Sequence, residues 1–169
     1  SAYARMFHAL YKTPVTIARL FMVYGPGQRD LNKLIPYVTL SLLRGQSPEL
    51  TSGQRLVDWI YVKDVVNGLL KIAQSQNIDG HTLDLGSGAL VSIREIVHQL
   101  VSIINPDIKP LFGNIPDRPL EQVIVASIKD TYNTIGWKPV TPIDKGLDIT
   151  VNWFKEQLYN TDEPDIPKT

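Results

Sequence analysis

Residues 15–30 read VTIARLFMVYGPGQRD and give the clearest indication of the fold. From Val15 to Val23 the chain is almost entirely apolar and rich in β-branched residues, a pattern typical of a strand that a parallel sheet buries on both faces. The segment YGPGQRD then ends the strand, because glycine and proline interrupt strand geometry. Ligands of open α/β sheets bind beyond the carboxyl ends of the strands. The sequence therefore predicts a parallel α/β sheet with a candidate site wall at 24–30.

Helical and strand patterns alternate along the rest of the chain. Further strands are expected at 57–61, 82–88, 108–112 and 122–126. Helices are expected at 1–12, 33–44, 65–74, 93–105 and 128–135, and from Pro142 to Asn160. Residues 161–169 contain two prolines and three acids without apolar periodicity, which indicates a frayed tail.

Several expected helices begin at side chains suited to capping. Asn32 is expected to cap the second helix and Asp64 the third, while Ser92 and Glu95 have the spacing of a capping box. The third helix is expected to bury one stripe, made of Val65, Leu69 and Ala73. Since capping accounts for Asp64, Glu95 and Asp144, no pair of carboxylates stands out for acid–base catalysis.

Composition excludes several classes of protein. Lysine plus arginine and aspartate plus glutamate both total 17 in 169 residues, so no basic excess favours nucleic-acid binding. The chain has no cysteine, which excludes disulfides and cysteine-based metal sites and is compatible with a reducing compartment. Three scattered histidines argue against a metal centre and carry no expected catalytic role. The longest apolar stretch, residues 34–43, is far shorter than the roughly 20 residues of a membrane span.

Six blocks in a fixed order carry a resemblance to a known family. They are ARLFMVYGPGQ (18–28), KLIP (33–36), DWIYVKDV (58–65), LDLGSG (83–88), DRPLEQ (117–122) and IGWKP (135–139). Together they resemble the C-terminal half of the extended short-chain dehydrogenase/reductase family, the NAD-dependent sugar-nucleotide epimerases and dehydratases. The resemblance covers about residues 1–158.

The resemblance implies an α/β fold with the last strands of a Rossmann-type parallel sheet and a small C-terminal α/β substrate-binding lobe. We expect residues 1–90 to be the C-terminal part of the NAD-binding Rossmann domain with interleaved lobe segments, 91–160 the substrate-binding lobe and 161–169 a flexible tail. The family's catalytic Tyr-x-x-x-Lys and glycine-rich loop would lie before Ser1. We therefore expect a fragment of a longer cytoplasmic enzyme that uses NAD or NADP, with no catalytic residue in this chain.

Three cations are candidates for binding the diphosphate of a nucleoside-diphosphate sugar. Arg118 lies between two prolines, and its planar fork can bind two oxygens at once; it also matches the family's diphosphate-binding arginine. Lys33 matches the lysine of the KLIP block. The family's arginine before the aspartate of the DWIYV block is replaced by Val57, so Arg55, two residues earlier, is a weaker candidate. Arg118 could instead be a solvated loop arginine paired with Asp117 or Glu121, and Lys33 could be a surface lysine in the first helical turn.

Apolar candidates complete the expected site. Pro48 and Leu50 match a segment that often lines the base pocket in the family, although an exposed connecting loop explains them nearly as well. Leu20, Phe21 and Met22 end the strand nearest the expected nicotinamide, and core packing is the simpler explanation of Leu20 and Phe21. Met22 replaces the family's asparagine, and a thioether is a poor hydrogen-bond partner for substrate.

The Gly86-Ser87-Gly88 turn lacks the third glycine of a dinucleotide fingerprint and favours close packing over a phosphate cradle. The expected function is the substrate-binding portion of a 4-epimerase-like enzyme, an isomerase, or of a 4,6-dehydratase, a lyase. A non-catalytic binding or dimerisation module and a reductase acting on a non-sugar substrate remain alternatives. Met6, Phe7 and Leu10 give the first helix an apolar face, and the resemblance implies a homodimer formed there.

Overall fold

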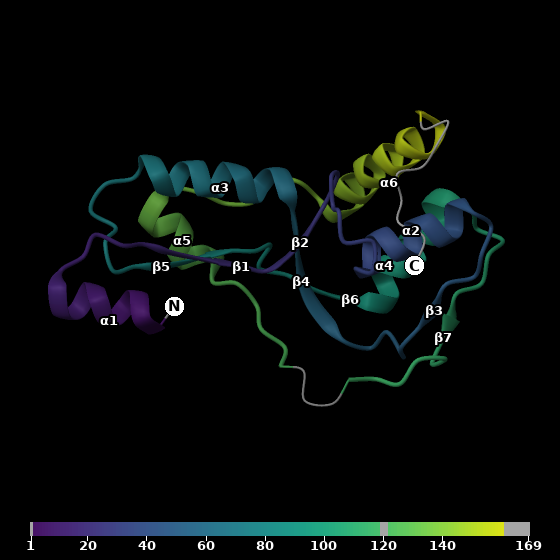
Figure 1. Cartoon of the computed structure of the whole chain (residues 1–169), viewed down its shortest axis with the longest axis horizontal. Coiled ribbons are helices and arrows are strands. Elements are labelled where there is room, and N and C mark those ends of the chain that lie inside the picture. The colour runs from purple at the N-terminus through teal and green to yellow at the C-terminus, as the bar shows by residue number, and fades with distance from the viewer. Residues whose placement is uncertain (1, 119–121, 161–169) are drawn as a thin grey trace. The chain divides into compact units, whose positions relative to one another are not determined.

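The computed structural model describes residues 2–118 and 122–160 (Figure 1). The helices are α1 (Ala2–Tyr11), α2 (Leu34–Leu43), α3 (Val62–Gln74), α4 (Ile93–Ile104), α5 (Ile128–Ile135) and α6 (Ile143–Asn160). The strands are β1 (Ile17–Leu20), β2 (Met22–Tyr24), β3 (Glu49–Leu50), β4 (Leu56–Tyr61), β5 (Thr82–Leu85), β6 (Leu90–Ser92) and β7 (Leu111–Phe112). All six expected helices are confirmed close to their predicted bounds. The predicted tail at 161–169 lies outside the described residues.

The chain forms two compact units, each built from three separate segments. Among the described residues, unit 1 contains 2–23, 56–91 and 123–141, and unit 2 contains 24–55, 92–118, 122 and 142–160. Strands of the sheets are ordered β1-β5, β2-β4-β6 and β3-β7.

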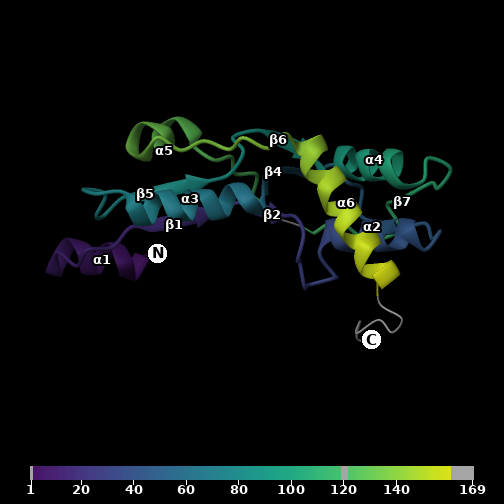
Figure 2. The ribbon, with the colours of Figure 1, turned by 90° about the horizontal axis from the view of Figure 1, so that it is seen from above.

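A parallel strand pair covered by two helices forms the core of unit 1. β1 pairs with β5 in the register Ile17↔Thr82 to Leu20↔Leu85. α3 and α5 lie alongside these strands (Figures 1 and 2). The core comprises buried residues of β4, β5, α3, α5 and the loops beside them, namely Ile60, Val65, Ile78, Leu83, Leu85, Ile135 and Trp137.

One strand prediction is wrong in part, and another is wrong altogether. The apolar run 15–23 is broken at Phe21, so that β1 and β2 belong to different sheets, and Leu20 is 48% exposed rather than covered. No strand forms at 122–127, where Val123 and Val125 are about half exposed, although Ala126 is buried. β-Branched residues favour a strand only where a neighbouring strand can accept their backbone hydrogen bonds. Here the N–H of Ala126 instead donates to the carboxylate of Asp58.

Two predicted caps are also wrong. Lys33, not Asn32, is the N-cap residue of α2, and the N–H of Asn32 donates to Asp30 in the preceding turn. α3 begins before Asp64, whose carboxylate accepts a hydrogen bond from the N–H of Thr141, 3.0 Å away. The buried face of α3 consists of Asp64, Val65 and Gly68, whereas Leu69 and Ala73 are exposed. The capping box of Ser92 and Glu95 is confirmed.

Unit 2 consists of three helices and a short parallel strand pair. α2 packs against both α4 and α6, and α4 also packs against α6. Their contact faces are fully buried at Val38 of α2, Leu100 of α4, and Leu147 and Val151 of α6. β3 and β7 pair in the register Glu49↔Leu111 and Leu50↔Phe112. None of the helices within 2–118 and 122–160 is long and apolar enough to cross a membrane.

Candidate functional site

The short strand pair of unit 2 joins two segments that carry predicted site residues. The N–H of Leu111 donates to the carbonyl of Pro48 across 2.9 Å. The N–H groups of Gly113 and Ile115 both donate to the carbonyl of Leu50, at 3.0 and 3.1 Å. These bonds extend the pairing past both ends of β3 and β7. As a result, residues 48–55 and 111–118 run side by side.

Ser52 connects the segments that contain Arg55 and Arg118. Its N–H donates to a carboxylate oxygen of Asp117, the residue directly before Arg118, at 3.1 Å. The Arg118 side chain itself is exposed, and it makes no hydrogen bond or ion pair with any residue that the structure describes. Arg55 is half-buried. The structure therefore fixes the backbone beside Arg118 and leaves its guanidinium exposed.

The first turn of α4 is attached to the same segment. Arg94 donates from Nη2 to the carbonyl of Ser52 at 2.7 Å, and its N–H donates to the carbonyl of Gly53 at 2.9 Å. Its guanidinium carbon lies 3.9 Å from the centre of the Phe112 ring. The N–H of Ile93 donates to the carbonyl of Arg55 at 3.0 Å. We call residues 48–55, 92–94 and 111–118 the arginine platform, after Arg55, Arg94 and Arg118.

Gly53 makes this close approach possible. Its φ of +73° is in the left-handed region, and a Cβ atom there would lie 2.9 Å from the Phe112 ring and 3.1 Å from Cβ of Arg94. The platform has three arginines and two carboxylates, Glu49 and Asp117. The carboxylate of Asp117 already accepts a backbone hydrogen bond. This arrangement can attract an anion of the size of a diphosphate.

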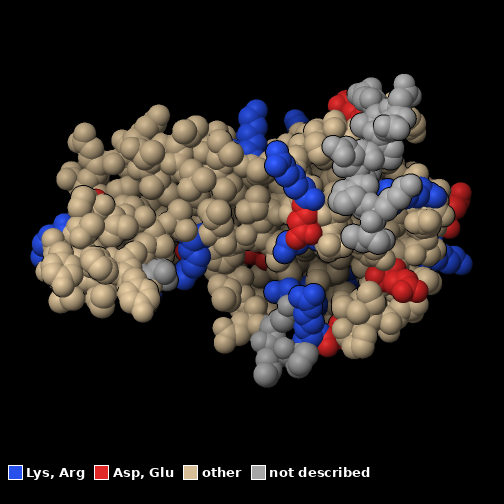
Figure 3. Space-filling model, viewed as in Figure 1, with Lys and Arg blue, Asp and Glu red and all other residues tan. Residues whose placement is uncertain are grey.

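Lys33 lies elsewhere in unit 2. As the N-cap residue of α2 it forms an ion pair with Asp30 at 3.8 Å, and both side chains are more than half exposed. Within the described part of the chain, the hydrogen bonds and the ion pair of Lys33 join it to Asp30 and Tyr37 and not to the platform. On the face shown in Figure 3, Lys and Arg side chains are few over α1, β1 and α3, which belong to unit 1.

Pro48 and Leu50 are both buried, and Leu50 is only 4% exposed. Their alternative reading as an exposed connecting loop is therefore wrong: the segment contains β3. Leu20, expected to be core, is 48% exposed at the end of β1. Phe21 is half-buried and packs against the core of unit 1, and Met22 is half-buried at the start of β2.

Unit 1 contains a buried carboxylate that binds the Gly86–Gly88 turn. Asp58 is 1% exposed and accepts hydrogen bonds from the N–H groups of Ser87, Gly88 and Ala126 at 2.6, 3.0 and 2.9 Å. The Ser87 hydroxyl donates to it as well, at 2.7 Å. A Cβ atom on Gly86 would lie 2.5 Å from that of Ala126. The predicted close-packing role of the turn is confirmed, because Asp58 occupies the amides that a phosphate would need.

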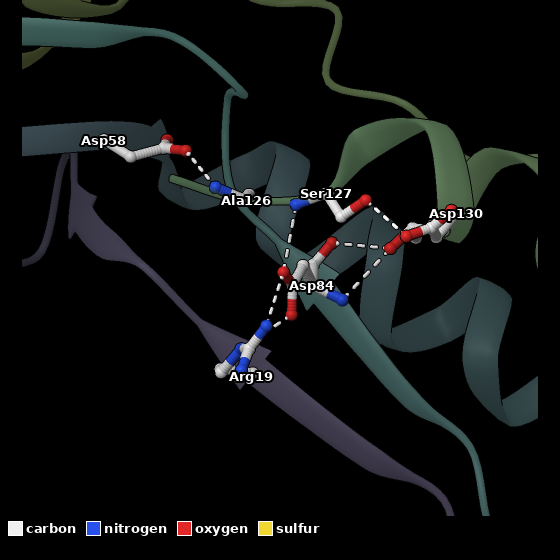
Figure 4. A network of polar contacts seen from close by, with 7 residues as sticks. Arg19, Asp58, Asp84, Ala126, Ser127 and Asp130 are labelled. Carbon is white, nitrogen blue, oxygen red and sulfur yellow. Dashed lines mark hydrogen bonds and ion pairs between the residues drawn. The ribbon is translucent and has the colours of Figure 1, made fainter. Parts of the chain in front are cut away.

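A second network joins β1, β5 and α5 (Figure 4). Arg19 donates two hydrogen bonds to Asp84, at 2.7 and 2.8 Å, and the N–H of Ser127 donates a third at 3.0 Å. Burial by itself would raise the pKa of Asp84, but the bonds from Arg19 and Ser127 outweigh it and lower that pKa. The bond to Asp84 raises the pKa of Arg19. Both shifts favour the charged pair, which crosslinks the parallel strands.

Sequence analysis missed Arg94, although one signal was present. Arg94 is in the first turn of a helix, where the helix dipole disfavours positive charge, so an arginine there calls for an explanation. Nor did the sequence patterns predict that Asp58 binds the 86–88 turn and Ala126. Among residues 2–118 and 122–160, no three histidine or acidic side chains converge as a metal site would require.

The model of the NAD dependent epimerase/dehydratase family matches residues 1–86. CDP-abequose synthase of Salmonella typhimurium is 33% identical over 135 residues, which are 77% of this chain and 45% of that protein. dTDP-D-glucose 4,6-dehydratase of Mus musculus is 26% identical over 156 residues, which are 89% of this chain and 43% of that one.

Among solved structures, that of UDP-glucose 4-epimerase of Thermotoga maritima with UDP-glucose superposes with a TM-score of 0.83 at 25% identity. The superposition covers 93% of this chain and 51% of the epimerase. It confirms the predicted Rossmann-type α/β fold. The chain spans about half the length of the proteins that it matches.

Proposed function

Because this chain belongs to the NAD-dependent epimerase/dehydratase family, we propose that it is the substrate-binding part of an enzyme that remodels the sugar of a nucleoside-diphosphate sugar. The resemblance inferred from six sequence blocks is thereby confirmed at the level of the family. A 4-epimerase is the first candidate, and a 4,6-dehydratase is the second. In this proposal unit 1 completes the Rossmann sheet, and unit 2 is the lobe that binds the nucleotide.

One observation supports the proposal most directly. The Ser52–Asp117 bond fixes the backbone beside Arg118, while the guanidinium remains exposed. A positively charged fork on a fixed backbone suits a diphosphate, because little conformational entropy is lost when it binds. Leu50 and Pro48 are buried residues of the platform and would support its backbone beside the nucleotide. Lys33 and Arg55 remain secondary candidates for the same ligand.

NAD, when bound, supplies the hydride acceptor of such a reaction. The side chains in this chain fit only the edge of a cofactor site: Leu20 offers an exposed apolar surface at the end of β1, beside Phe21 and Met22. The Gly86–Gly88 turn does not fit the cofactor's diphosphate, because its amides bind Asp58. We propose that these three residues form a wall beside NAD or NADP and that residues outside this chain bind its phosphates.

Proton transfer is assigned to residues outside this chain as well. No tyrosine in the sequence is followed by lysine four positions later. The platform contributes binding and orientation, which lower a barrier by holding the sugar in a reactive geometry. By itself, the chain is expected to bind a sugar nucleotide without converting it.

We propose a second copy of the chain as the partner of α1. No residue of α1 is buried, and Tyr3, Phe7 and Leu10 are 78, 48 and 65% exposed. Exposed apolar side chains gathered on one helix favour association. A homodimer formed through α1 would cover them.

Arg118→Ala tests the proposed ligand. If Arg118 binds the diphosphate, the substitution should weaken binding of nucleoside-diphosphate sugars by roughly 1.5 to 3 kcal/mol, or one to two decades in Kd, without changing the melting temperature. Arg44→Ala is the matched control, because Arg44 is an exposed arginine of the same unit outside the platform. The measurement is calorimetric titration with UDP-, dTDP- and CDP-glucose.

The outcome separates the alternatives. Wild-type binding that Arg118→Ala weakens and Arg44→Ala preserves supports the sugar-nucleotide site. Equal affinity in all three proteins removes Arg118 from the site. Failure of the wild type to bind any of the three nucleotides favours a non-catalytic module or a reductase for a non-sugar substrate.

A further inference from the structure

We propose that Arg94 is a positioning residue for nucleotide binding: it holds the Ser52 backbone, and through Ser52 it sets the place of Arg118. This inference rests on the proposed function. It concerns a residue for which neither the motifs nor the family resemblance suggested any role.

The contacts form a continuous chain from Arg94 to Arg118. The Arg94 guanidinium lies over the Phe112 ring of β7 and donates to the carbonyl of Ser52 at 2.7 Å. The N–H of the same residue, Ser52, donates to Asp117 at 3.1 Å. Ser52 is therefore held from both sides, and one of these bonds ends next to Arg118.

Stability alone does not explain an arginine at position 94. Its positive charge lies in the first turn of α4, where the dipole opposes it. Its Nε is buried without a hydrogen-bond partner in the described part of the chain. An unsatisfied buried donor costs free energy, and a residue that breaks a local rule is a candidate for a functional constraint.

Arginine has the geometry that this position requires. Its flat guanidinium can stack on Phe112 while an N–H in its plane donates sideways to a carbonyl. A lysine can donate to Ser52 but has no flat group to stack, and a methionine can cover the ring but donates nothing. Arg94→Lys and Arg94→Met therefore separate the two contacts.

The test measures Kd for the best-bound of UDP-, dTDP- and CDP-glucose. Arg94→Met should weaken binding by about tenfold. Without the hydrogen bond from Arg94, Ser52 shifts, and Arg118, which binds the nucleotide, shifts with it. Arg94→Lys should recover part of the loss. Arg44→Met, which removes an exposed arginine of the same unit, should leave Kd unchanged. Melting temperatures show whether any loss follows unfolding.

Asp117→Ala, which removes the acceptor of the Ser52 N–H, completes a double-mutant cycle. If Arg94 acts through Ser52 and Asp117, adding Asp117→Ala to Arg94→Met should weaken binding by much less than the product of the two single effects. If the effects of the two substitutions on Kd multiply, or if Arg94→Met binds as tightly as the wild type, Arg94 is not a positioning residue. The proposed function would still stand. Absence of wild-type binding to all three sugar nucleotides would refute the proposed function, and this inference with it.

Discussion

Asp58 should be the most sensitive polar side chain of unit 1. It is 1% exposed, and four donors from the 86–88 turn and Ala126 converge on its two oxygens. Asp58→Asn keeps one oxygen and turns an NH₂ group toward the donors of the other. In the better orientation the NH₂ faces the N–H and the hydroxyl of Ser87. The hydroxyl can rotate to accept from the NH₂, but the buried N–H of Ser87 is left without an acceptor.

One such orphan costs about 1 to 3 kcal/mol, so Asp58→Asn should lower the free energy of unfolding by that amount. Asp58→Ala removes both oxygens and leaves three N–H groups unsatisfied; we expect a loss of about 3 to 5 kcal/mol. The assay is urea denaturation followed by circular dichroism, with amide hydrogen exchange at Gly88 and Ala126 to report locally. Asp79→Asn, an exposed carboxylate of the same unit, is the control. Losses as small as the control's would show that the hydrogen bonds to Asp58 contribute little to stability.

Two further predictions concern the ion pair and the first helix. Since the pKa of Asp84 is lowered in the folded protein, its stabilising contribution is present above the unfolded carboxyl's pKa of about 3.9 and is lost as pH falls through the folded value. Asp84→Asn should therefore destabilise the protein at pH 7 and reduce the further loss of stability as the pH falls, measured by thermal melting from pH 7 to 2. The double substitution Phe7→Glu and Leu10→Glu should convert a dimer to a monomer in sedimentation. A wild-type monomer, or a dimer that survives both changes, would contradict the role of α1.

Local sequence signals predicted the helices well. The capping box at Ser92 and the glycine after α5 act within one turn of chain, so they are readable from neighbouring residues. Asp64 shows the limit of such reasoning: a good capping residue by type, its carboxylate instead accepts from Thr141, which is distant in sequence. The strand expected at 122–126 failed for the same reason, because its backbone groups depended on a partner that sequence spacing does not reveal.

The candidate site was only partly predictable. Arg118 and Arg55 could be proposed by residue type and by resemblance, but their connection through Ser52 depends on the register of β3 against β7. Arg94 forms a hydrogen bond with a residue 42 positions away in the chain. A positive charge at a helix start was the one local sign of its role.

The most direct test of the central claim is a residue-by-residue NMR titration of the ¹⁵N-labelled chain. The three nucleoside-diphosphate glucoses are added one at a time, and NAD is added separately. At least one sugar nucleotide should shift the amide resonances of Ser52, Gly53 and Arg118 and leave those of Ser87 and Gly88 in place. Shifts confined to Ser87 and Gly88, or sugar-nucleotide binding that leaves the platform resonances unmoved, would contradict it.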